Sequence, residues 1–289
     1  MNPFFGPAGS DDRFAAQGYR SVMQAPEYLS RMGLDAYEYQ GGRGIRISEE
    51  NAVQFGKKAR EFSIRLSVHA PYYISLSGVD EMKRAGSVDY ILQTARAAKW
   101  MGAGRIIVHS GSCAKISRLQ ALEYAKDTLR KALSALDEQG LSDIHICPET
   151  MGKINQLGTV EEVMELCSID ERLIPCIDFG HVNARTNGGL KSKRDYLKVL
   201  EAVENKLGGE RLRHFHSHFS KIEYTEKGGE KRHLTFDDRE YGPEFEPLAE
   251  LCCQKGCSPV FICESSGTQA EDALRMKKIY QDVAEGNEF

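Results

Sequence analysis

Short apolar segments alternate with longer amphipathic segments along almost the whole chain, and this alternation limits the fold more strongly than any other feature. Eight apolar segments are predicted strands, at Phe4–Phe5, Leu34–Tyr39, Ile64–His69, Arg105–His109, Ile144–Glu149, Leu173–Asp178, Leu212–Phe219 and Val260–Glu264. Helical periodicity separates them, most clearly in segment 122–136, where apolar residues are spaced by three or four. Apolar strands that alternate with amphipathic helices are typical of a parallel sheet covered by helices.

Eight strand–helix units most simply close into a (β/α)8 barrel, also called a TIM barrel, which needs about 250 residues. The chain has 289 residues, and a doubly wound open sheet is the alternative arrangement. No linker, charge block or low-complexity segment divides the sequence, so we expect an α/β fold with one barrel domain over residues 1–289. The segment Ser220–Glu240 is too polar for the core and too long for a normal loop. It is predicted to form a polar insertion after strand 7, as a lid or hairpin over the site.

The charge and the cysteines exclude several classes of protein. With 38 basic and 42 acidic residues the net charge is −4, which argues against a protein that coats nucleic acid through bulk positive charge but leaves room for a local basic groove. No segment is apolar enough for a membrane span, and no secretory signal is recognisable at the start of the chain. The eight cysteines form no paired CxxC pattern, as expected of reduced thiols. We therefore expect a cytoplasmic protein with no membrane partner and no evident obligate protein partner.

Residues that can bind a metal lie at the ends of six predicted strands. They are His69, His109, Glu149, Asp178, His216 and Glu264, and His181 and His233 lie just beyond strand ends. In a barrel these ends converge on one mouth, where carboxylates without a cation would repel one another. Mixed imidazole and carboxylate ligands suit zinc, manganese or iron(II). The sequence therefore predicts a metal site at the mouth.

Two ambiguities remain in this ligand set. His214, His216 and His218 alternate along one predicted strand and share a face, so one of them need not be a ligand, and the pattern does not say which. His145 is expected to be structural, because it alternates outward from its apolar neighbours. No P-loop, dinucleotide-binding glycine motif or nucleophile elbow offers competing chemistry.

Four motifs resemble those of the endonuclease IV family of apurinic/apyrimidinic endonucleases, within the xylose isomerase-like TIM-barrel superfamily. They are His69-Ala70-Pro71-Tyr72, Val108-His109-Ser110-Gly111-Ser112, the strand-end Glu149, and Cys176-Ile177-Asp178 followed by His181, in the family's order. The resemblance implies two or three zinc ions, with manganese as the alternative. By that resemblance, His69, His109 and Glu149 hold one ion, Glu149, Asp178, His216 and Glu264 a second, and His181 and His233 a third.

The resemblance also implies a hydrolase acting on phosphodiester bonds. Such an enzyme would cleave the DNA backbone on the 5′ side of abasic sites during base excision repair, with Glu149 and Glu264 as catalytic residues. Tyr72 would lie against the DNA, and Lys231 and Arg232 would contact it as further substrate-binding residues.

The chain departs from the family pattern in three places. Lys231-Arg232-His233 stands where the family has Asp-Arg-His, so either Lys231 replaces the charge of a third ion or Glu230 supplies the missing carboxylate. His216-Ser217-His218-Phe219 stands where the family has a histidine followed by an Asn-Asp pair. These two departures fall in the predicted metal centre. The third is the loop after the second strand, where the Gly-rich Tyr39-Gln40-Gly41-Gly42-Arg43 does not resemble the family's DNA-inserting loop and offers only Arg43 and Gln40 as wedges.

Two other functions fit parts of the same pattern. A divalent-metal sugar isomerase or epimerase would require only Glu149, Asp178, His216 and Glu264, and the additional histidines favour the phosphodiesterase. A noncatalytic, metal-stabilised barrel that binds nucleic acid or a protein is the third class. The number of bound metal ions would separate the first two functions.

Overall fold

The computed structural model describes residues 2–286, so residues 1 and 287–289 of the expected domain lie outside the described part. Eight parallel strands form the barrel predicted from the sequence: β1 (Phe4–Pro7), β2 (Ala36–Gln40), β3 (Arg65–His69), β4 (Arg105–His109), β5 (His145–Glu149), β6 (Cys176–Asp178), β7 (His216–Phe219) and β10 (Val260–Cys263). Their order is β1-β10-β7-β6-β5-β4-β3-β2, and a bridge between Ala8 and Glu38 brings β1 back to β2. The sheet is therefore a nearly closed barrel.

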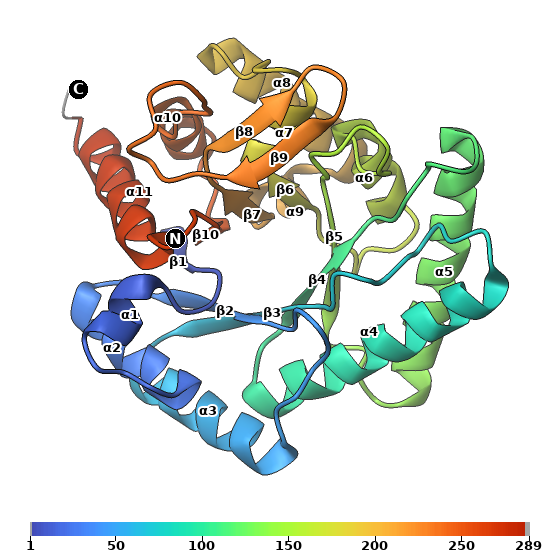
Figure 1. Cartoon of the computed structure of the whole chain (residues 1–289), viewed down its shortest axis with the longest axis horizontal. Coiled ribbons are helices and arrows are strands. Elements are labelled where there is room, and N and C mark those ends of the chain that lie inside the picture. Colours follow the sequence, from blue (N-terminus) through green and yellow to red (C-terminus); the bar gives the residue numbers. More distant parts are fainter. Residues whose placement is uncertain (1, 287–289) are drawn as a thin grey trace.

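Helices surround this barrel (Figure 1). They are α1 (Asp12–Ala16), the 3-10 helix η1 (Val22–Gln24), α2 (Ala25–Met32), α3 (Glu49–Glu61), α4 (Glu81–Met101), α5 (Arg118–Glu138), α6 (Val160–Cys167), α7 (Phe179–Arg185), α8 (Lys193–Leu207), α9 (Gly209–Arg213), α10 (Glu246–Lys255) and α11 (Gln269–Ala284). In α5 the predicted stripe is correct, because Ala125, Leu129 and Leu136 are fully buried. Burying a leucine side chain contributes about 1.5 to 3 kcal/mol, so this face holds the helix on the sheet.

Two predicted strands begin later than expected. The segment from Leu212 belongs to α9, and β7 starts only at His216. Leu173 makes a single bridge to Ile146 before β6 begins at Cys176. The reason is that a short apolar run does not distinguish a buried strand from a buried turn of helix.

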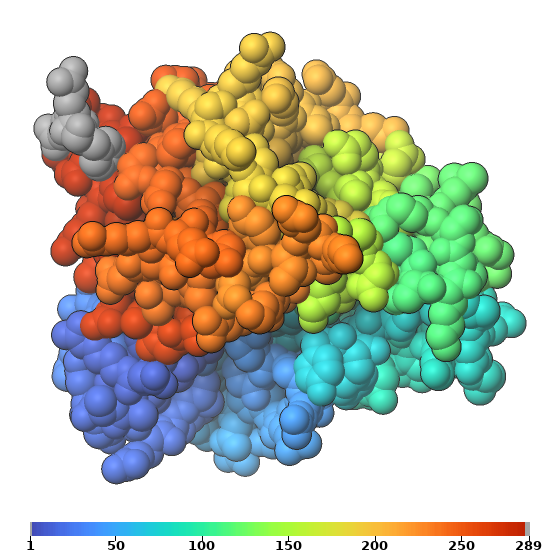
Figure 2. Space-filling view, turned by 45° about the horizontal axis from the view of Figure 1, so that its top comes forward, coloured from blue at the N-terminus to red at the C-terminus, as the bar shows by residue number. Residues whose placement is uncertain are grey.

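The polar insertion after β7 contains an antiparallel hairpin, as predicted. Its strands are β8 (Ile222–Thr225) and β9 (Gly229–His233). The hairpin is attached to the loop after β5, because the backbone N–H of Glu230 donates to the carbonyl of Gly152 at 3.2 Å. Figure 2 shows the orange hairpin segment at the surface beside this yellow-green loop. The insertion thus brings its own side chains to the mouth of the barrel.

Among residues 2–286, no helix has both the length and the apolar character that a membrane crossing requires. All eight cysteines are free thiols, and six of them are buried.

Candidate metal centre

A pocket of about 250 Å³ opens at the carboxyl ends of the strands. It is lined by Gln40, Gly42, His69, Ala70, Tyr72, His109, Glu149, Met151, Lys153, Gln156, His181, Glu230, His233 and Glu264. Asp178 and His218 are fully buried beneath it and belong to the same ligand groups. The mouth therefore gathers seven of the eight metal ligands predicted from the sequence, and the exception is His216.

The first ligand group joins the ends of three neighbouring strands, with His69, His109 and Glu149. The Nε2 atoms of both histidines lie 3.4 Å from Oε2 of Glu149. Nδ1 of His69 donates to the carbonyl of Ala70 at 2.8 Å, so Nε2 is the ring atom that faces the carboxylate. Oε2 of Glu149 is buried and has no hydrogen-bond partner within the described chain. Two imidazoles and an unpartnered carboxylate oxygen fit a cation such as zinc.

The second ligand group contains Glu149, Asp178, His218 and Glu264. His218 Nδ1 lies 3.1 Å from Oε1 of Glu149 and 3.6 Å from Oε1 of Glu264. Oδ2 of Asp178 is a second buried oxygen without a hydrogen-bond partner in residues 2–286. Three carboxylates and one imidazole around a common point again fit a divalent cation.

The structure places His218, and not His216, in the second ligand group, which corrects the position expected from the sequence. Both side chains point into the barrel, because alternate residues of a strand face the same side. The register of β6 and β7 pairs Cys176 with His216 and Asp178 with His218. His216 therefore lies one layer deeper, away from the mouth.

The third ligand group contains His181, Glu230 and His233. Nε2 of His181 lies 3.5 Å from Oε2 of Glu230, and the two imidazole rings are 5.6 Å apart. His181 Nδ1 donates to the carbonyl of Thr150 at 2.9 Å, which leaves Nε2 free to bind a cation. The hairpin therefore supplies two of the three side chains.

Glycine at position 152 allows the hairpin to come this close. A Cβ atom at Gly152 would lie 2.6 Å from Cβ of Glu230 and 2.9 Å from Cδ2 of His181. Neither contact is possible without a shift of the hairpin or the histidine. The close approach of the loop and β9 thus depends on the absent side chain.

Lys231 and Arg232 are not brought to the pocket. Both pair with Glu223 on the neighbouring strand of the hairpin, and the Nε atom of Arg232 lies 2.6 Å from Oε2 of that carboxylate. Their side chains are 57% and 70% exposed. The hairpin pairing shifts register at this point, with Glu223 opposite Arg232 and Tyr224 opposite Glu230, so Lys231 is an extra residue that turns to Glu223 while Glu230 faces the site. The basic side chain that lines the pocket is Lys153.

The imidazoles control the ionisation of the central carboxylate. Burial alone would raise the pKa of Glu149, but His218, His181 and His69 around it hold that pKa well below its usual range. Burial lowers the pKa of His109 to about 4, so this ring is neutral near pH 7. Burial also opposes the charge on His69, yet its contact with Glu149 raises the pKa to about 9. An ionised Glu149 is thus available to a cation at neutral pH.

Glu38 is a buried residue of this region that the sequence pattern did not indicate. Its carboxylate lies inside the barrel, 3.0 Å from both His216 and His218. The sequence does contain a sign of this position, because Glu38 is an acidic residue within the predicted strand Leu34–Tyr39, between Tyr37 and Tyr39.

Fold and site together define a TIM barrel with a candidate multi-ligand metal centre at its mouth. Residues 26–280 match the model of the family described as xylose isomerase-like TIM barrel. The chain belongs to this family.

Proteins with different names share this fold and parts of the sequence. An uncharacterized protein of Methanocaldococcus jannaschii is 32% identical over 279 residues, which cover 96% of this chain and 95% of the relative. A probable endonuclease 4 of Mycoplasma pneumoniae is 28% identical over 211 residues, 71% of this chain and 67% of that protein. This similarity confirms the resemblance to the endonuclease IV family.

Two solved structures show the same fold at low identity. Endonuclease IV from Thermus thermophilus superposes with a TM-score of 0.69 at 20% identity, over 98% of this chain and 100% of that one. A D-tagatose 3-epimerase-like protein superposes with a TM-score of 0.71 at 19% identity, over 98% of this chain and 97% of that one.

Proposed function

We propose that the protein is a zinc-dependent phosphodiesterase that hydrolyses the DNA backbone on the 5′ side of abasic sites. The observation that carries this proposal is the third ligand group, His181, Glu230 and His233, beside the two groups that share Glu149. An enzyme that binds a sugar at a single metal ion does not require this third ligand group. Relatives named probable endonuclease 4 support the same assignment.

The side chains fit two or three divalent ions, with Mn²⁺ as the alternative to zinc. Such ions would act as Lewis acids toward the phosphate and activate water. Glu149 belongs to the first two ligand groups, so its carboxylate would help to hold an ion in each. Glu264 lines the pocket and contacts His218, where its carboxylate can hold a proton released by the attacking water.

The rim of the pocket offers contacts for DNA. Tyr72 is 56% exposed, and its backbone N–H donates to the carbonyl of Gly42 at 3.2 Å, which ties the two rim loops together. Lys153 lines the pocket and can meet a phosphate there. Lys231 and Arg232, on the exposed side of the hairpin, would reach a duplex only beyond the pocket.

The test combines metal analysis with a cleavage assay. We expect two or three zinc ions per chain, and cleavage 5′ to a single abasic site in a duplex but not in the matched undamaged duplex. Chelator treatment should remove both metal and activity. Binding of the abasic duplex without cleavage by the zinc-loaded protein would instead favour a noncatalytic binding barrel.

A sugar isomerase or epimerase is the second candidate, because Glu149, Asp178, His218 and Glu264 by themselves form a single-ion site. The similarity in fold to a D-tagatose 3-epimerase-like protein agrees with it. One manganese or magnesium ion per chain, together with epimerisation of a ketose, would favour this function over the nuclease.

Tyr72→Ala is expected to weaken binding of abasic DNA by about 5- to 150-fold, because stacking on an aromatic ring contributes about 1 to 3 kcal/mol per base. Fluorescence anisotropy with a labelled duplex measures the effect. Met82→Ala is the control, since this exposed side chain lies in the first turn of α4 and does not line the pocket. Unchanged DNA affinity with a lowered melting temperature would show that Tyr72 serves packing.

A further inference from the structure

Glu38 is a fully buried carboxylate inside the barrel, directly below the mouth. Its Oε2 atom accepts hydrogen bonds from the Ser67 hydroxyl at 2.8 Å and from Nε2 of His216 at 3.0 Å. Its Oε1 atom accepts from Gln40 at 3.3 Å and lies 3.0 Å from Nε2 of His218. Three of these neighbours hold the carboxylate in place, and the fourth belongs to the metal centre.

His218 lies between two carboxylates, with Nε2 toward Glu38 and Nδ1 toward Glu149. The contact with Glu38 has the length of a hydrogen bond but not its alignment, and Nε2 has no hydrogen-bond partner within residues 2–286. A neutral imidazole carries one N–H and one lone pair. If the N–H is on Nε2, Glu38 is its acceptor, and the Nδ1 lone pair faces Glu149, Asp178 and Glu264.

We propose that Glu38 is a positioning residue of the metal centre, which fixes the ring orientation and tautomer of His218 so that Nδ1 binds the ion. Histidines that bind metals commonly donate their other N–H to a carboxylate, and loss of that partner typically weakens metal binding by about 10- to 100-fold. The inference rests on the metal centre of the proposed function and assigns a role to a residue outside the motifs of the resemblance.

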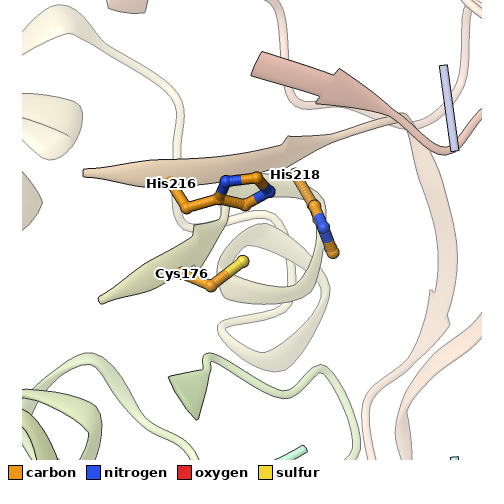
Figure 3. A group of neighbouring side chains, drawn as sticks. All are labelled: Cys176, His216 and His218. Atoms are coloured by element: carbon orange, nitrogen blue, oxygen red, sulfur yellow. The ribbon is translucent and has the colours of Figure 1, made fainter. Parts of the chain in front are cut away.

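The layer below the mouth is better explained as support than as a separate metal site. Figure 3 shows His216 and His218 on one strand with Cys176 beside them, and the three could hold an ion. However, Nε2 of both histidines already faces Glu38. Burial raises the pKa of the Cys176 thiol, which keeps it protonated, and Cys176 packs with Ile107 and Cys147 in an apolar cluster.

Glu38→Gln tests the proposal, because the amide keeps the size of the side chain and loses the charge. We expect the apparent zinc affinity at the centre to fall by about 10- to 100-fold, with unchanged stoichiometry at saturating zinc. Competition with a chromophoric chelator measures it. Ser67→Ala is the control, since it removes a hydrogen bond to the same carboxylate but leaves the acceptor of His218. The zinc affinity of Ser67→Ala should stay near that of the wild type. The zinc affinity of Glu38→Asp should fall between those of Glu38→Gln and the wild type.

Each outcome separates this inference from the proposed function. Wild-type zinc affinity in Glu38→Gln would overturn the positioning role, as would loss of one ion at saturating zinc, which would make Glu38 a ligand. If the wild-type protein fails to cleave abasic DNA but Glu38→Gln shows the expected loss of zinc affinity, the proposed nuclease function is wrong and the positioning role still holds. If Glu38→Gln does not fold, nitrogen NMR of the zinc-loaded wild type decides: the inference requires His218 to be protonated at Nε2, and protonation at Nδ1 contradicts it.

Discussion

Glu149→Gln is expected to abolish DNA cleavage while leaving the barrel folded. Glu149 belongs to two ligand groups, and its two oxygens face His69 and His109 on one side and His218 on the other. The amide removes the negative charge that both ligand groups would offer to a cation. A loss of about 4 kcal/mol of transition-state stabilisation, within the range that metal ions supply, corresponds to about a thousandfold in rate.

Single-turnover cleavage at saturating enzyme, with zinc content measured on the same sample, tests this prediction. Glu165→Gln is a matched control, because Glu165 forms its ion pairs with Lys126 and Lys206 on the outer helices. The control should keep wild-type rate and zinc content, and circular dichroism should show the same fold in both variants. Near wild-type turnover by Glu149→Gln at equal metal content would show that Glu149 is not the shared ligand.

The positions of the ligands along the chain were predictable because barrel topology turns strand ends into neighbours. His69, His109, Glu149 and Glu264 end or directly follow their strands, and all four line one pocket. This inference needs no side-chain detail, since the carboxyl ends of parallel strands meet at one rim. The polar insertion was equally visible, because its composition excludes it from the core.

The depth of a side chain inside the barrel was not predictable in the same way. His216 and His218 have the same alternation, and only the pairing of β7 with β6 shows which one reaches the mouth. The sequence pattern specifies which face a residue occupies, whereas the register that sets its height depends on tertiary packing. For the same reason Glu38, in the middle of its strand, did not stand out as a neighbour of the centre.

In the hairpin, too, the sequence pattern did not specify which side chain faces the site. Lys231 occupies the motif position that suggested contact with the substrate, but at the register shift in the hairpin Glu230 turns toward His181 and Lys231 toward Glu223. A carboxylate one residue away can thus take the place of the expected one.

Glu230→Gln is therefore expected to lower the zinc content by about one ion per chain and to weaken cleavage. Two imidazoles alone, from His181 and His233, leave a cation with fewer than the three or four protein ligands usual for zinc. Elemental analysis after dialysis against low zinc measures the stoichiometry. Glu226→Gln is the matched control, since this exposed carboxylate lies in the turn of the same hairpin. The control should keep the full zinc content.

Gly152→Ala and Lys231→Asp extend the test to the two explanations of the altered motif. The alanine Cβ would push against Glu230 and His181 without changing any ligand, so Gly152→Ala should also lose the third ion. Lys231→Asp should leave the zinc content unchanged, because its side chain faces Glu223 and Glu230 already provides the carboxylate. A gain of one ion in Lys231→Asp, with no loss in Glu230→Gln, would show instead that the third ligand group is incomplete and that the lysine takes the place of the ion.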